Sequence, residues 1–174
     1  PRIAYVNKMD INGADFYRVE KMIRERLGAN PVPIELPIGK EADFRGIIDL
    51  IRMEAEIYYD DLGKDFRKEP IPDDMKALAD EYRAKLLEEA ASGSDEIMEK
   101  YFEEGDLSEE DIIKGLRARC LKMESIPMLC GSSNKNKGVQ FLLDAVIHFL
   151  PSPLDVDHVK GVNPDTGEEE EKKI

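Results

Sequence analysis

The sequence predicts an α/β fold whose parallel sheet is interrupted by an acidic α+β insert. Residues 1–30 and 126–150 each show a short apolar strand, a polar loop and an amphipathic helix. Between them, residues 60–111 hold 19 acidic and only 7 basic residues. Consecutive strand–loop–helix units place their strands side by side in one parallel sheet, so we expect the acidic middle to be inserted between two neighbouring strands.

The two end segments supply the strands and helices of that sheet. In the first, the apolar residues 3–6 are typical of a buried strand, residues 7–15 form a polar loop, and a helix follows up to a stop at Gly28. In the second, residues 126–130 are the strand and residues 131–137 the loop. An apolar stripe marks the helix after it: Val139, Leu142, Leu143, Val146, Ile147 and Leu150. The chain opens directly at a strand, so we expect it to be part of a longer protein.

The middle segment predicts a small antiparallel sheet followed by three helices. Residues 31–38, 46–50 and 55–59 are short strand-like runs, the first of them rich in proline. From Pro72 onward, apolar residues recur at helical spacing in three successive blocks. Three polar residues are the expected N-caps of these helices: Asp73, Ser94 and Ser108. Beyond the last helix we expect a linker with a turn at residues 163–167.

Composition excludes several classes of protein. The 174 residues carry a net charge of −13, and no apolar run approaches the roughly 20 residues that cross a bilayer. Phosphate backbones bind surfaces rich in Lys and Arg, so we expect neither direct nucleic-acid binding nor membrane contact by this segment. Cys120 and Cys130 fit no disulfide framework and no zinc spacing, and no metal site is predicted. These features favour a reducing cytoplasm.

The polar loop after the first strand has the residues of a guanine-selective pocket. Ligands of parallel α/β sheets bind beyond the carboxyl ends of the strands, where Asn7, Lys8 and Asp10 lie. The Asp10 carboxylate can accept hydrogen bonds from the ring N–H and the exocyclic amine of guanine, a donor pair that adenine lacks. Asn7 can meet the acceptors of the base and hold the loop, and the Lys8 stem can cover a ring face.

The loop after the second strand complements the first. The small residues Gly131, Ser132 and Ser133 let backbone N–H groups approach guanine O6, and Ser132 can brace the first loop. Asn-Lys-x-Asp is by itself a weak pattern, and two solvated turns are the alternative interpretation. Its place after a buried strand, with a Gly-Ser-Ser loop after the next core strand, favours a base pocket formed by both loops.

No phosphate-binding or catalytic residue can be assigned. The pattern Gly-x-x-x-x-Gly-Lys-Ser/Thr, which holds phosphates and Mg²⁺, does not occur in the sequence. Asp-x-x-Gly occurs at residues 10–13, 43–46 and 60–63, and each of these is better interpreted as a turn. We therefore predict that this chain alone does not hydrolyse GTP.

Four stretches of the sequence resemble the bacterial translation elongation factor G family, whose members are GTPases that drive tRNA and mRNA movement on the ribosome. They are residues 1–16 (PRIAYVNKMDINGADF), 27–33 (LGANPVP), 130–140 (CGSSNKNKGVQ) and 150–154 (LPSPL). The resemblance runs through nearly the whole chain. It implies the C-terminal half of a P-loop GTPase (Ras-like) parallel-sheet domain, with the acidic middle corresponding to the inserted subdomain called G prime.

The resemblance also implies a role for each candidate residue. Asn7, Lys8 and Asp10 would be the fourth GTPase motif, and Ser132 with Ser133 the fifth. The bound nucleotide would be GTP or GDP, with Mg²⁺ held only in the intact protein. The implied division is two GTPase-domain parts, a G prime insert, and a linker toward the next domain: residues 1–36 and 123–152, residues 37–122, and residues 153–174.

Two residues depart from the family pattern. The family usually has Ala at the position of Ser133 and an aromatic residue at that of Asn134, so packing around the base is altered while the Ser133 backbone N–H is retained. A ribosome-protection or release-factor GTPase of the same superfamily is the alternative assignment. The run at residues 135–140 and the length of the insert favour the elongation factor.

The acidic insert indicates a second function. Exposed carboxylates can steer a basic partner, and in the resembling family this subdomain meets the C-terminal domain of the ribosomal stalk protein. The residues expected in this field are Asp80, Glu81, Glu88, Glu89, Glu103 and Glu104. A solvated helix surface is the alternative, as is an interaction module without nucleotide chemistry. The strand at residues 3–6 is expected at a sheet edge, where a non-physiological dimer would form.

Overall fold

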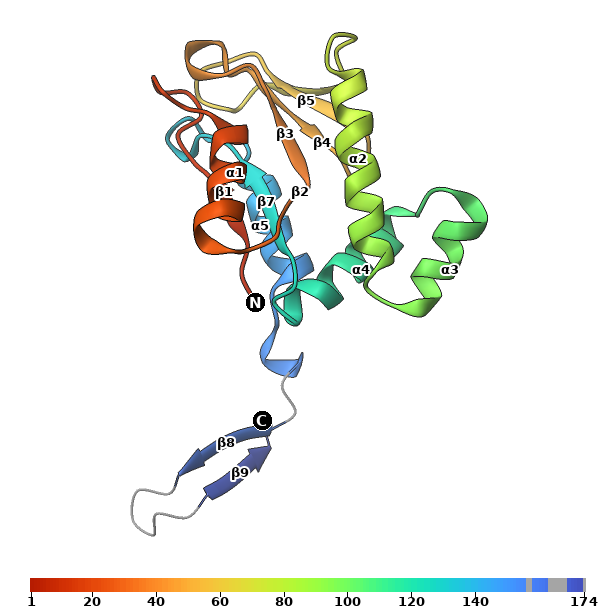
Figure 1. The fold of residues 1–174 in the computed structure, drawn as a ribbon. Helices are drawn as coiled ribbons and strands as arrows, with labels where there is room; N and C mark the ends of the chain where they lie inside the picture. Colours follow the sequence, from red (N-terminus) through yellow and green to blue (C-terminus); the bar gives the residue numbers. More distant parts are fainter. Residues whose placement is uncertain (156–157, 163–168, 174) are drawn as a thin grey trace.

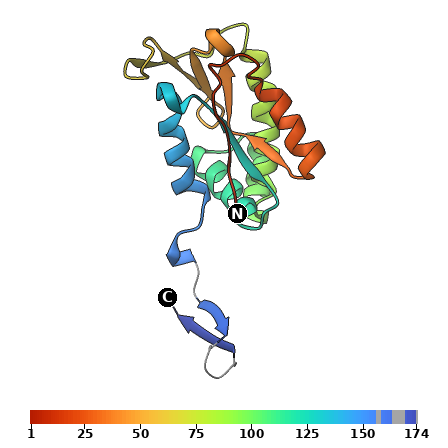
Figure 2. The same cartoon turned by 90° about the vertical axis from the view of Figure 1, so that its left-hand side faces the viewer.

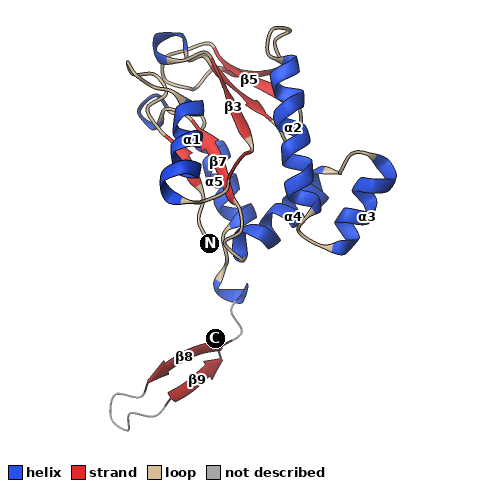
Figure 3. Ribbon diagram, in the orientation of Figure 1, coloured by secondary structure: helices blue, strands red, loops and turns tan. Residues whose placement is uncertain are grey.

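The computed structural model describes residues 1–155, 158–162 and 169–173. Within these residues the chain forms a parallel sheet and an antiparallel sheet (Figure 1). Both sheets contribute side chains to one apolar core. Helices pack around the strands of both sheets (Figure 3). None of the helices in this described part is long and apolar enough to span a membrane.

The parallel sheet has the order β1 (Ala4–Val6), β7 (Ile126–Cys130), β2 (Pro31–Pro33), with β7 in the centre. Strands β1 and β7 pair directly although more than a hundred residues separate them in sequence, which is the pairing expected if the middle segment is inserted between them. Helices α1 (Phe16–Leu27) and α5 (Val139–Phe149) cover opposite faces of this sheet (Figures 1 and 2). Strand β1 lies at the sheet edge, where the predicted dimer would pair.

Helix α5 buries a different face from the one predicted. Ala145 and Phe149 are buried, and Phe141 packs against the same core. These residues are spaced by four, so they line one side of the helix. Three members of the predicted stripe are exposed instead: Leu143, Val146 and Ile147. The helix is apolar on more than one side, so its periodicity could not single out the buried face.

The antiparallel sheet, called here the insert sheet, contains the predicted strands and one more. Its strands, in spatial order, are β3 (Glu35–Ile38), β4 (Gly46–Asp49), β5 (Glu54–Tyr58) and β6 (Phe66–Glu69). Strand β6 was not predicted because its sequence, FRKE, is polar and mostly exposed. The predicted run at residues 31–38 divides between two sheets, with β2 in the parallel sheet and β3 in the insert sheet.

The three predicted insert helices are present as α2 (Lys76–Ala91), α3 (Asp95–Glu104) and α4 (Glu109–Leu121). Ser94 and Ser108 cap α3 and α4 as predicted, their hydroxyl oxygens accepting hydrogen bonds from N–H groups of the first turn. The predicted cap Asp73 is wrong. A turn from Pro72 delays the start of α2, Met75 occupies its N-cap, and Asp73 pairs with Lys76 instead.

The tail contains a short antiparallel pair where a linker was predicted. Strands β8 (His158–Val162) and β9 (Glu169–Lys173) form a sheet of their own. The predicted turn at residues 163–167 lies outside the described residues. Three single 3₁₀ turns complete the described secondary structure: Glu41–Asp43, Ser133–Lys135 and Pro153–Asp155.

Candidate nucleotide-binding site

The parallel sheet brings the two predicted loops together at one edge. Val6 is in register with Cys130, so the first loop (residues 7–15) and the second loop (residues 131–137) start side by side. The Gly131 N–H donates to the Val6 carbonyl at 3.1 Å, and the Met9 N–H donates to the Gly131 carbonyl at 3.0 Å. A Cβ on Gly131 would lie 2.2 Å from the Tyr5 hydroxyl oxygen. This close approach therefore requires glycine.

Asn7 ties the two loops together through its side chain. Its Oδ1 accepts hydrogen bonds from the backbone N–H of Ser133 at 3.0 Å and of Lys8 at 2.8 Å. Lys8 adopts a left-handed backbone conformation with φ 62°, which residues other than glycine rarely adopt. The Ser133 N–H, predicted to face the base, is thus engaged by Asn7, and the amide nitrogen of Asn7 is the group that can meet a base acceptor.

Asp10 and Ser132 face each other across the two loops. The Ser132 hydroxyl is the main influence that lowers the pKa of the Asp10 carboxyl, and the charges of Lys135 and Lys137 add to it. The Ser132 Oγ is buried and makes no hydrogen bond of ordinary geometry. Asp10 is therefore ionised at neutral pH, which suits it to accept hydrogen bonds. The loops are neighbours, as the predicted pocket requires.

The exposed groups of the two loops lie on the solvent side of this junction. Asn7, Lys8 and Ser133 are exposed, whereas Met9 and Ser132 are buried. A cavity of about 210 Å³ beside the first loop is lined by residues of that loop and the start of α1, without Ser132 or Ser133. The candidate site is therefore an exposed edge formed by two loops rather than that cavity.

Sequence reasoning missed the residues that hold the second loop from behind. The Ser132 N–H donates to the Lys137 carbonyl at 2.9 Å, and the Lys137 N–H donates to the Ser132 carbonyl at 3.0 Å. These two bonds close the loop. Tyr58 of β5 and Glu35 of β3 accept hydrogen bonds at its two ends. Glu35 was detectable as the one charged residue in an otherwise apolar and proline-containing run; Tyr58 had no signal in the sequence.

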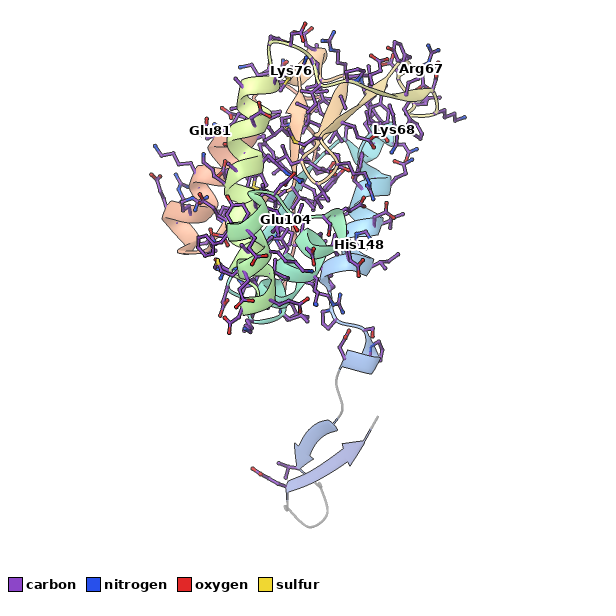
Figure 4. The ribbon with its side chains drawn as sticks, turned by 90° about the vertical axis from the view of Figure 1, so that its right-hand side faces the viewer. Arg67, Lys68, Lys76, Glu81, Glu104 and His148 are labelled. Atoms are coloured by element: carbon purple, nitrogen blue, oxygen red, sulfur yellow. The ribbon has the colours of Figure 1, made fainter. Side chains whose placement is uncertain are left out.

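Most of the predicted acidic field is exposed on the insert helices. The five exposed members are Asp80, Glu81, Glu88, Glu103 and Glu104. Figure 4 shows two of them, Glu81 on α2 and Glu104 at the end of α3. Glu89 is the exception, because it accepts hydrogen bonds from Asn30 and Ser125 and pairs with Arg119 at 3.1 Å. Glu89 is thus a structural residue and not part of the acidic field.

A parallel sheet with two polar loops joined at the carboxyl ends of its strands is an arrangement shared by α/β nucleotide-binding domains. The chain belongs to the family described as Elongation factor Tu GTP binding domain, which matches residues 1–152. The predicted fold class is confirmed, and the resemblance is confirmed at the level of a translation GTPase family domain.

A solved structure of a Thermus thermophilus protein is similar to this chain. The sequence identity is 25%, the TM-score is 0.76, and the match covers 96% of this chain. It covers 26% of the Thermus protein, so this chain spans about a quarter of that length. Within the described residues, no cluster of His, Cys, Asp and Glu is arranged to hold a metal ion.

Proposed function

We propose that this chain is the guanine-recognising part of an elongation factor G, the GTPase that promotes ribosomal translocation. The observation that carries the proposal is the convergence of Asn7, ionised Asp10 and the Ser132–Ser133 backbone at one sheet edge. Membership in the GTP-binding family supports it, as does the acidic subdomain between the two loops. A ribosome-protection or release-factor GTPase is the alternative assignment.

Each residue has a distinct part in the proposed recognition. The Asp10 carboxylate accepts from the ring N–H and the exocyclic amine of guanine, and the Lys8 stem covers one face of the ring. The Asn7 amide nitrogen donates to the base. The Ser133 N–H, which donates to Asn7 in the free chain, is shared with guanine O6 on binding, as N–H groups between two acceptors often are.

Hydrolysis of GTP belongs, in this proposal, to the complete protein. The sequence contains no Gly-x-x-x-x-Gly-Lys-Ser/Thr pattern, so the phosphates and Mg²⁺ are held elsewhere. We assign no catalytic residue to this chain and expect it to have no GTPase activity alone. Its contribution is selectivity, because only guanine presents the donor pair that an ionised Asp10 accepts.

Substitution of Asp10 by Asn in the complete GTPase tests the proposal. We expect GDP affinity to fall about 100-fold or more, since two hydrogen bonds to a charged acceptor are lost. Xanthosine diphosphate, whose second ring oxygen suits an amide donor, should bind better than it does to the wild type. Competition binding with both nucleotides measures the change.

Asp15→Asn is the matched control for this experiment. Asp15 caps α1 through its Oδ1, a role that asparagine also fulfils, and it lies five residues from Asp10. Its nucleotide preference should equal that of the wild type. An unchanged preference for GDP over xanthosine diphosphate in Asp10→Asn would refute the assigned role.

A second proposed function is docking of a basic partner, the ribosomal stalk protein in the resembling family, on the acidic field. Its five carboxylates are exposed on two neighbouring helices, where they can steer association. Salt screens such interactions, so the association should weaken as ionic strength rises from about 0.05 to 0.5 M. Binding that is insensitive to salt would assign the partner to another surface.

A further inference from the structure

One face of the insert sheet is turned toward the second loop. Glu35 is in register with Asp49, and Asp49 with Glu54, so their side chains share a face. Side chains alternate along a strand, which puts Tyr58 on the same face as Glu54. Ile47 also belongs to it, and a Cβ on Gly138 would lie 2.6 Å from the Ile47 Cδ1. The face therefore packs directly against the end of the loop.

Two side chains of this face hold the two ends of the loop. Glu35 Oε2 accepts a hydrogen bond from the N–H of Cys130, the residue just before the loop, at 3.1 Å. The Tyr58 hydroxyl oxygen accepts one from the N–H of Gly138, the residue just after it, at 2.9 Å. Both contacts are buried, so water does not replace either acceptor without opening the packing.

The orientation of the Tyr58 hydroxyl is itself fixed. The hydroxyl donates to the carboxylate of Glu56, two residues earlier on β5, which leaves its oxygen free to accept from Gly138. Its ring lies 5.7 Å from the Lys137 ammonium, in the range of a cation–π contact. Lys137 in turn closes the loop through its backbone bonds with Ser132. Tyr58 thus contacts both the end and the closing residue of the loop.

The turn between β5 and β6 lies against the back of the same loop. A Cβ on Gly63, whose φ is 63°, would lie 2.4 Å from the Asn136 carbonyl oxygen. Asp61 pairs with Lys135 at 3.5 Å. The insert therefore meets the second loop at its start, at its end and along its back.

We propose that Tyr58 and Glu35 are positioning residues, through which the insert sheet sets the place of Ser132 and Ser133 relative to the base. The part of this inference that concerns the bound base rests on the proposed function, whereas the part that concerns the position of the loop does not. The loop is short and its ends are fixed by the insert, so a displacement of the insert sheet displaces the loop. The first loop meets the insert at a separate point, because the Glu41 N–H donates to the Met9 carbonyl at 2.9 Å and the Glu41 carboxylate accepts from the Gly13 N–H at 2.7 Å. Neither of these bonds involves Tyr58 or Glu35.

Tyr58→Phe is the decisive variant, since it removes one hydroxyl and keeps the ring. We expect amide exchange at Gly138 in this chain to accelerate about tenfold, the effect of losing one buried acceptor. Exchange in α2 should not change. Tyr59→Phe is the matched control, because the exposed Tyr59 hydroxyl donates to Glu69, away from the loop.

Nucleotide analogues separate positioning from general destabilisation in the complete GTPase. 2-Aminopurine riboside diphosphate lacks O6, the atom proposed to face the second loop, together with the ring N–H that faces Asp10. Inosine diphosphate keeps both of these and lacks only the exocyclic amine that faces Asp10, so a change confined to the first analogue reports on O6 as long as Asp10 is unaltered. Tyr58→Phe should reduce the preference for GDP over the 2-aminopurine analogue about fivefold and leave the preference over inosine diphosphate unchanged. Glu35→Gln, which keeps an oxygen acceptor for Cys130, should retain both preferences.

Several results would overturn the inference. The first is a Gly138 amide that is not protected from exchange in the wild type, and the second is a Gly138 exchange rate that Tyr58→Phe leaves unchanged. The third is an equal loss, in Tyr58→Phe, of the preference for GDP over the 2-aminopurine analogue and over inosine diphosphate. The wild-type exchange measurement does not depend on any variant folding. Absence of any GDP preference in the wild type would instead refute the proposed function, and the exchange results would still decide whether the insert holds the loop.

Discussion

At the junction of the two loops, several polar groups are buried or bonded to backbone, whereas the acidic field on the insert helices is exposed to water. Asn7 and Ser132 are bonded to or face the neighbouring loop, and the ends of the second loop are held by buried acceptors. On α2, Lys85 and Glu81 form an ion pair in which both side chains are about 60% exposed. Glutamate therefore has two physical roles, as a buried acceptor at Glu35 and as an exposed charge at Glu81.

The comparison teaches where substitutions should matter. A buried polar group that loses its partner costs about 1 to 3 kcal/mol, while an exposed ion pair contributes about 0 to 1 kcal/mol. The loops should be sensitive to single atoms, and the acidic field should respond only to its summed charge and to salt. Variants in each region test this division.

Gly131→Ala should have the largest effect. The added Cβ would lie 2.2 Å from the Tyr5 hydroxyl oxygen and 2.4 Å from the Lys137 carbonyl oxygen, so the loops must separate. We expect the free energy of unfolding to fall by about 3 kcal/mol, as for severe overpacking. Gly161→Ala, with no atom near the added Cβ, is the control and should stay within about 0.5 kcal/mol of the wild type in urea unfolding. Equal losses in the two variants would show that the junction tolerates a side chain.

Glu35 should give the next largest effect, and one that depends on pH. Burial raises the pKa of its carboxyl well above the ordinary value, and Asp49 and Glu56 raise it further. A raised carboxyl pKa means that the folded chain favours the protonated form. Its stabilising contribution is thus complete below the unfolded pKa near 4.5 and is lost as pH rises through the folded pKa.

Glu35→Gln should remove this loss of stability at high pH, because glutamine does not ionise. At pH 8 we expect the variant to be more stable than the wild type by about 1 to 3 kcal/mol, with the difference vanishing near pH 4. Thermal or urea unfolding across that range measures it. Glu35→Ala, which deprives the Cys130 N–H of its acceptor, should be less stable than Glu35→Gln at every pH. If the wild type became more stable relative to Glu35→Gln as pH rises, the assigned pKa shift of Glu35 would be wrong.

Glu88 and Glu89 offer the smallest and most local test of the comparison. They are adjacent on α2, yet Glu88 is exposed while Glu89 contacts Asn30, Ser125 and Arg119. Glu89→Gln should lower stability by about 1 kcal/mol, and Glu88→Gln should stay within about 0.5 kcal/mol. For association with a basic partner the order should reverse, with only Glu88→Gln reducing the salt dependence. If the two variants had the same stability and the same salt-dependent association, Glu88 and Glu89 would not differ as surface and structural carboxylates.

Local patterns made much of the fold and candidate site predictable. The two strand–loop–helix units follow from apolar runs and helical spacing, and their parallel pairing then brings Asn7, Asp10 and Ser132 to one edge. The residues that hold the second loop were beyond such reasoning. The bond from Gly138 to Tyr58 spans 80 residues and depends on how two sheets dock, which no local pattern encodes.

The errors have similar physical causes. On α5, packing selected Ala145 and Phe149 from a helix that is apolar on several sides. At the start of α2, a turn overrode the capping preference of Asp73. Strand β6 is polar because it lies at the open edge of its sheet, so it lacked the apolar alternation that identifies a strand.

Both cysteines are buried, so the rate at which each is alkylated can report local opening of the structure. The pKa of the Cys130 thiol is raised by burial, so little reactive thiolate exists while the end of β7 stays closed. Alkylation of Cys130 consequently requires a transient opening of the packing around the end of β7. Its labelling rate, compared with that of Cys120 in the last turn of α4, would report how often this packing opens.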